Sequence, residues 1–163
     1  MTRRGLRSPP PVTRGLCRMA SATLFKKILV PVDNAKYSID AARFAIQLAQ
    51  LHNAQLIFLH VVDTRAIETM ARYGSESKES LIVKAEESGW KILYSLEEEA
   101  VTGQVRVALT LEEGTPQRVI LDAAEKYRVD LIVLGKPRKS GARKDAVMEP
   151  VIENAECPVL LSK

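Results

Sequence analysis

The chain is poor in the residues on which most metal and redox sites depend. It contains two cysteines and two histidines in 163 residues, so neither a disulfide framework nor a Cys/His metal site is expected. Cys17 and Cys157 fit a reduced, cytoplasmic setting best. No apolar run approaches the ~18 residues of a membrane helix, and the amino-terminal segment has no apolar core of a secretory signal. We therefore expect a cytoplasmic protein without membrane contact.

Acidic residues are missing from the first 22 positions, which account for the net positive charge of the chain. This segment has a charge of +5, from Arg3, Arg4, Arg7, Arg14 and Arg18. The rest holds 19 basic residues (24 minus 5) and 20 acidic ones, a net charge of −1. A body this close to neutral gives no electrostatic reason to expect a nucleic-acid partner.

Residues 1–22 are expected to form a disordered basic extension, because they contain little apolar surface to bury. An organelle-targeting helix is the alternative, but Pro9, Pro10 and Pro11 interrupt it. Met19 is an alternative translation start. We leave this segment out of the fold and assign residues 23–163 to a single domain.

From residue 26 onward, short apolar runs alternate with helical patterns, which is typical of an α/β protein with a parallel sheet. The predicted strands cover residues 28–33, 55–62, 105–109, 130–135 and 159–162. The predicted helices cover residues 38–51, 78–100, 115–127 and 149–155, with a polar connection over 63–77. Ser38 is the predicted cap of the first helix, and Gly89 a point of local weakness in the second. The expected fold is a single open five-stranded parallel sheet sandwiched by about four helices, of the Rossmann-like, nucleotide-binding type.

The common phosphate-binding fingerprints are absent. The spacing of Gly135 and Gly141 does not fit a P-loop, and the first strand is followed by Asp33 rather than by a glycine-rich turn. His60 lies in an apolar run and is interpreted as a hydrogen-bonded core residue. These absences favour ligand binding over catalysis.

Two features mark a crevice at the carboxyl ends of the strands. Asp33 ends the first strand, where it either meets a ligand or caps a turn. Five cations follow the fourth strand, at Lys136, Arg138, Lys139, Arg143 and Lys144. Such a run is either a solvated face or, above a strand end and beside a helix start, an anion site.

Five segments in this order resemble the universal stress protein family, which belongs to the adenine-nucleotide-binding α/β class. They are residues 27–33 (KILVPVD), 59–62 (LHVV), 114–116 (GTP), 130–135 (DLIVLG) and 157–161 (CPVLL). The resemblance implies a homodimer joined through the last strand, Val159–Ser162, and ATP binding in some members.

The resemblance also implies a ligand site at the strand ends. Its adenine side would comprise Pro31, Asp33 and the backbone at Val61. Its phosphate side would comprise Gly135, Arg138 and Gly141.

The phosphate side departs from the family pattern. Arg138 replaces a glycine, and Met148-Glu149 replaces a closing Gly-Ser pair. With Pro150 in the first turn of the predicted helix, the Glu149 carboxylate would lie where phosphates dock. Two like charges ~4 Å apart repel by ~4 kcal/mol near a protein surface. We therefore expect tight ATP binding to be lost, unless the cations recruit phosphate from another direction.

The leading interpretation is a non-catalytic stress-response protein that binds an adenine-type ligand weakly, or a protein partner. The alternative is an ATP-binding, nucleotide-dependent switch or slow ATPase. Mg²⁺ would enter only with ATP, and Ser140 is the one hydroxyl of the loop.

Overall fold

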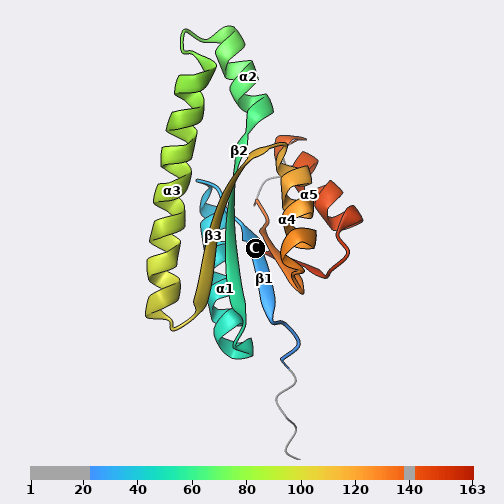
Figure 1. Ribbon diagram of the computed structural model, residues 1–163. Coiled ribbons are helices and arrows are strands. Elements are labelled where there is room, and N and C mark those ends of the chain that lie inside the picture. The colour runs from blue at the N-terminus through green and yellow to red at the C-terminus, as the bar shows by residue number, and fades with distance from the viewer. Residues whose placement is uncertain (1–22, 138–141) are drawn as a thin grey trace, which may run out of the picture.

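The computed structural model describes residues 23–137 and 142–163, with backbone alone over 142–145. A five-stranded, all-parallel sheet has the order β3-β2-β1-β4-β5. Its strands are β1 (Lys27–Pro31), β2 (Gln55–Asp63), β3 (Arg106–Gly114), β4 (Leu131–Gly135) and β5 (Val159–Ser162). Strands β1, β2 and β3 are labelled in Figure 1. The helices are α1 (Lys36–His52), α2 (Thr64–Tyr73), α3 (Lys78–Thr102), α4 (Pro116–Tyr127) and α5 (Ala142–Asn154).

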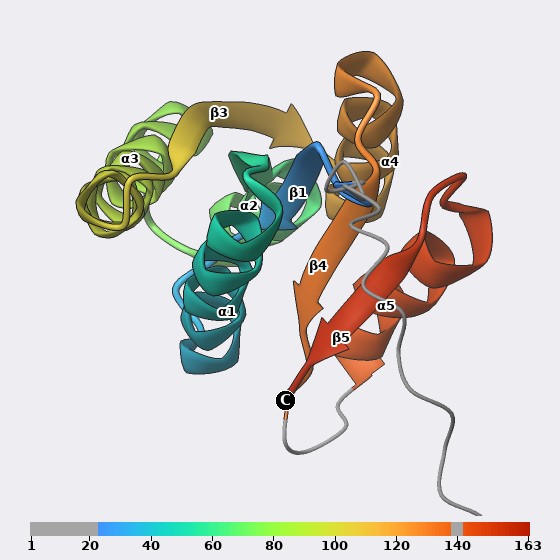
Figure 2. The same ribbon diagram turned by 90° about the horizontal axis from the view of Figure 1, so that it is seen from below.

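The two faces of the sheet carry separate hydrophobic cores. Alternate strand residues point to opposite faces, so Ile28 and Val30 join the core under α1 and α3, whereas Leu29 joins the core under α4 and α5. Figure 2 shows these helix pairs on the two sides of the sheet. No helix in the described ranges combines the length and hydrophobicity needed to cross a membrane. The predicted α/β class and five-stranded parallel sheet are confirmed.

Three element predictions are wrong. Residues 64–73 of the predicted connection form α2, whose start is capped because the Asp63 carboxylate accepts the N–H groups of Arg65 and Ala66. The third strand continues to Gly114. The last helix begins at Ala142, so Glu149 and Pro150 lie inside α5 rather than at its start.

Ser38 and Gly89 also differ from their predicted roles. Ser38 lies inside α1, and its hydroxyl accepts the N–H of Asp33 instead of capping the helix. Gly89 does not interrupt α3, which is continuous over 25 residues. The predicted amino-terminal extension, residues 1–22, lies outside the described residues.

The predicted buried, hydrogen-bonded state of His60 is confirmed. Its side chain is 8% exposed, and Nδ1 lies 2.9 Å from the carbonyl oxygen of Val32. Because a carbonyl only accepts, Nδ1 carries the hydrogen. A Cβ at position 89 would lie 2.3 Å from Cδ2 of this ring, so glycine is what allows α3 to pack over His60.

We expect Gly89→Ala to destabilise the fold by about 2 kcal/mol, because steric overlap with a buried ring outweighs the ~1 kcal/mol gained in helix propensity. Chemical denaturation measures the free energy of unfolding. Ser95→Ala, at an exposed position of the same helix, is the matched control and should be neutral or mildly stabilising. Equal or higher stability of Gly89→Ala would contradict the packing explanation.

Candidate functional site

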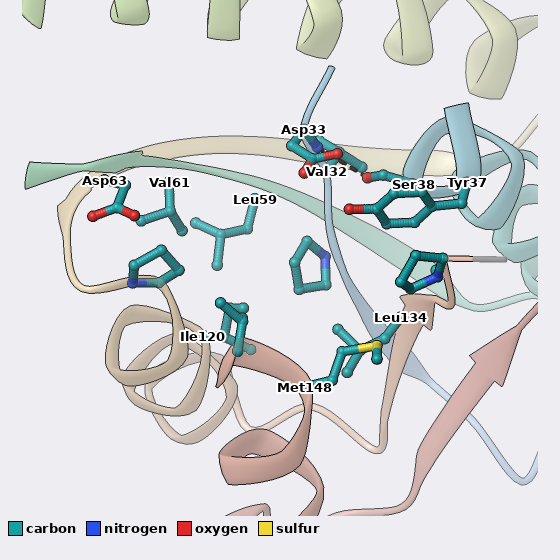
Figure 3. A pocket seen from close by; sticks show the side chains of 15 residues that line it. Val32, Asp33, Tyr37, Ser38, Leu59, Val61, Asp63, Ile120, Leu134 and Met148 are labelled. Carbon is teal, nitrogen blue, oxygen red and sulfur yellow. Dashed lines mark hydrogen bonds between the residues drawn. The ribbon is translucent and has the colours of Figure 1, made fainter. Parts of the chain in front are cut away.

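A pocket of about 370 Å³ lies at the carboxyl ends of β1, β2 and β4. Strand ends and α1 line one side of it, while α4 and α5 line the other (Figure 3). Its apolar wall includes Leu59, Ile120, Leu134 and Met148. The crevice beyond the carboxyl ends of parallel strands is the usual ligand site of open α/β sheets, so the predicted location agrees with the pocket.

The pocket opens because β1 and β2 stop pairing. Their ladder ends at Pro31 opposite Leu59, and the last bond runs from the Val32 N–H to the Leu59 carbonyl, 2.8 Å. The main chain of Leu59 thus faces β1. Val61, two residues further, faces the same side, beyond the point where β1 has turned away. This geometry directs the N–H and C=O of Val61 toward the pocket, with one donor beside one acceptor.

Asp33 begins the turn that leads β1 into α1. Its Oδ1 accepts the Ala35 N–H at 2.9 Å, and its own N–H donates to the Ser38 hydroxyl at 2.9 Å. Asp33 is exposed and lines the pocket. A carboxylate offers about four acceptor positions, so the turn bond leaves capacity for a ligand. Both sequence interpretations, turn residue and pocket residue, therefore describe the same side chain.

Gly135 has a packing role that the sequence did not reveal. A Cβ at this position would lie 2.3 Å from the carbonyl oxygen of Tyr37 and 3.0 Å from Cα of Ser38. The glycine therefore lets the first turn of α1 pack on the end of β4. Close approach of backbone to backbone is a sufficient reason for glycine here.

Three polar pocket residues were not identified from the sequence as lining the site. Asp63 lies at the end of β2 beside Val61, and Tyr37 and Ser38 lie on α1 at the other end of the pocket (Figure 3). Burial, and then the negative charge of Asp33, raise the pKa of Tyr37, so this phenol stays protonated at neutral pH. From the sequence, only the alternating pattern of β2 and the helical pattern of α1 could have indicated that these three residues face the pocket.

The predicted position of Glu149 at a helix start, from which it would block phosphate, is wrong. Because α5 begins at Ala142, Glu149 lies within the helix, is exposed, and is not among the residues that line the pocket. Its neighbours Val147 and Met148 line the pocket instead. Of the other phosphate-side predictions, Arg138 and Gly141 lie outside the described residues. The charged side chains described along the pocket wall are Asp33 and Asp63, both acidic.

A second cavity, of about 550 Å³, opens at the opposite end of the sheet, beside Asp130 and Cys157. The Asp130 carboxylate accepts the N–H groups of Lys26 and Lys27, at 2.8 and 2.9 Å, and so joins the start of β1 to β4. Burial raises the pKa of the Cys157 thiol, which makes its thiolate scarce at neutral pH. These features indicate that this end of the sheet has a structural role.

Comparison with known proteins agrees with this fold. A universal stress protein of Methanocaldococcus jannaschii is 35% identical over 143 residues, which are 86% of this chain and 83% of that protein. The solved structure of a second such protein from the same organism has a TM-score of 0.73 at 26% identity, over 86% of this chain and 96% of that one. The universal stress protein of Archaeoglobus fulgidus in complex with dAMP has a TM-score of 0.60 at 22% identity, over 86% and 99%. That last likeness concerns the fold alone. The model of the universal stress protein family matches residues 24–163, and the chain belongs to this family.

Proposed function

We propose that the pocket binds an adenine nucleotide through its adenosine half, and that the protein acts in the cytoplasmic stress response by binding rather than by turnover. The observation that carries the proposal is the main chain of Val61. It points past the end of β1 into a pocket whose walls are largely apolar. The dAMP complex of the Archaeoglobus relative supports an adenine ligand for this fold.

The base is recognised by shape and by hydrogen bonding. A flat, apolar ring system fits between Leu59 and Val61 on the sheet side and Ile120 on α4. Adenine presents an amino donor next to a ring-nitrogen acceptor, which complements the C=O and N–H of a single strand residue. Val61 offers that pair, and a base with an oxygen in place of the amino group would oppose acceptor to acceptor.

The pocket has side chains that suit the sugar of a nucleotide but not its phosphates. Asp33 accepts hydrogen bonds and suits the hydroxyls of a ribose. The carboxylates of Asp33 and Asp63 both disfavour phosphate binding, because like charges repel across a short distance. Within the described lining, recognition therefore favours the nucleoside part of the ligand.

The first test changes the base of the ligand and, separately, the side chain of Asp33. Calorimetry should give AMP an affinity about ten- to a hundredfold higher than that of IMP, because one unmatched buried polar group costs ~1–3 kcal/mol. Asp33→Asn should weaken AMP binding about tenfold through loss of the charged acceptor, while asparagine preserves the turn. Asp40→Asn, an exposed position on α1, is the matched control. Equal affinities for AMP and IMP would refute recognition of adenine by Val61.

The second test addresses the switch or slow-ATPase alternative. With Mg²⁺ present, ATP should bind within about tenfold of AMP, since the described lining repels the added phosphates. Incubation with ATP should release phosphate no faster than a protein-free blank. ATP binding more than about a hundredfold tighter than AMP binding, together with phosphate release, would favour the alternative and a phosphate clamp built from residues 136–144.

We also propose a homodimer that forms through β5, an edge strand of the sheet. The carbonyls of Pro158 and Ser162 accept the N–H groups of Ile132 in β4 and of Lys136 just after it. The main chain of Leu161, between them, therefore faces away from the sheet. The Leu161 side chain is 38% exposed. An edge with free N–H and C=O groups is a template for pairing with another strand, and two copies of β5 can satisfy each other around a two-fold axis.

Leu161→Pro should convert the dimer to a monomer, because it deletes an outward N–H while sparing the bonds to β4. Leu161→Ala, which keeps that N–H, is the matched control and should remain dimeric. Sedimentation or light scattering measures the mass, which for the dimer is twice the 18.1 kDa of the chain. A monomeric native protein, or a dimeric proline variant, would exclude this interface.

A further inference from the structure

Helix α3 carries an apolar stripe that does not face the sheet. The inward face of α3 consists of buried residues, namely Gly89, Leu93, Leu96 and Ala100. At ~100° per residue, four other residues align on a different flank: Val83, Trp90, Tyr94 and Val101. We call these four residues the aromatic stripe. Val83, Tyr94 and Val101 are 51%, 54% and 60% exposed, so the stripe faces solvent along most of its length.

The flank of α3 that carries the stripe is the one away from α1. The opposite flank of α3 contacts α1 and the turn before it. There the Ser88 hydroxyl accepts a hydrogen bond from the side-chain amide of Asn34, and Glu99 forms an ion pair with Arg43. Trp90 packs against the same core as Leu109 of the edge strand β3. The stripe therefore borders an open edge of the sheet. At its centre the rings of Trp90 and Tyr94 stack, with centroids 5.5 Å apart and planes at 26°.

Four carboxylates frame the stacked rings. Glu86 and Glu87 stand one turn before Trp90, and Glu97 and Glu98 one turn after Tyr94. In the described part of the chain none of the four is in an ion pair, whereas Glu99 on the other flank pairs with Arg43. Aromatic faces between carboxylates suit guanidinium groups, which stack on the rings and donate to the acids.

The charge of the stripe decides between occupants. A second copy packed on this flank around a two-fold axis would bring the same four carboxylates against each other, which is repulsive. A basic, acid-free segment is complementary instead. We propose that the aromatic stripe binds the chain's own residues 1–22, which contain five arginines and no acidic residue.

Geometry allows this intramolecular contact. Lys27, Gln55 and Arg106 are aligned in register, so β1 begins at the end of the sheet where α3 leads into β3. Figure 1 shows the start of β1 and the carboxyl end of α3 at the same, lower end of the molecule. A chain of 22 residues spans up to about 70 Å, and α3 is about 37 Å long. The segment can therefore reach every part of the stripe from Thr23.

Fluorescence tests the proposal directly, because Trp90 is the only tryptophan of the chain. Quenching by acrylamide, a neutral solute, measures how accessible its ring is. In the full chain at low salt the docked segment should shield Trp90. Replacing all five arginines of residues 1–22 by serine should raise the quenching constant roughly twofold, and about 1 M salt should do the same to the native chain by screening the charges.

Matched carboxylate variants complete the test. Glu97→Gln with Glu98→Gln should reproduce the rise in quenching. Glu149→Gln with Glu153→Gln removes the same charge from exposed positions on α5 and should leave quenching at the native value. Equal quenching in the native chain, the serine variant and high salt would overturn the proposal. Shielding that survives the serine replacements but disappears on dilution, in a Leu161→Pro chain that still has the mass of a dimer, would overturn it in favour of a second copy.

Discussion

The separation of β1 from β2 after the pair Pro31–Leu59 is the constraint on which the site depends. Backbone hydrogen bonds hold the strands together up to this pair, and side-chain bonds hold them apart beyond it. Ser38 and Asp33 fix the turn into α1, while Gly135 lets α1 settle on the end of β4. The main chain of Val61 is thereby directed toward a cavity instead of a neighbouring strand. A longer β1 would pair with Val61 and close the pocket.

The strands and most helices were predictable because their signals are local. Buried parallel strands appear as continuous apolar runs, and Pro116 marks a helix start that the structure confirms. α2 was missed because it buries only Ile67 and otherwise resembles a polar loop. The start of α5 was misplaced because Pro150 favours a first-turn position, a preference that tertiary packing overrides here. Val151, the next residue, is fully buried in the core under α4 and α5.

The site was predictable only where chain order alone brings residues to the same edge. Pro31, Val61 and Gly135 lie near the carboxyl ends of strands and Asp33 follows one, and all four line the pocket. Tyr37 and Ile120 come from helix faces, whose rotation no sequence pattern specified. The predicted position of Glu149 was wrong for the same reason. A helix that begins earlier turns that carboxylate outward and presents Met148 to the pocket.

His60 links the pocket to the helix that carries the aromatic stripe. Its ring supports the Val32 carbonyl, one residue before Asp33, and is itself packed under Gly89 of α3. The position of Asp33 therefore depends on how closely α3 approaches the sheet. Contact alone does not couple two sites, since coupling requires an element with two arrangements that both sites bias. A buried layer closed by a glycine contact has little room for a second arrangement. The pocket and the stripe are thus expected to act as independent surfaces on one rigid scaffold, one recognising a base and the other positive charge.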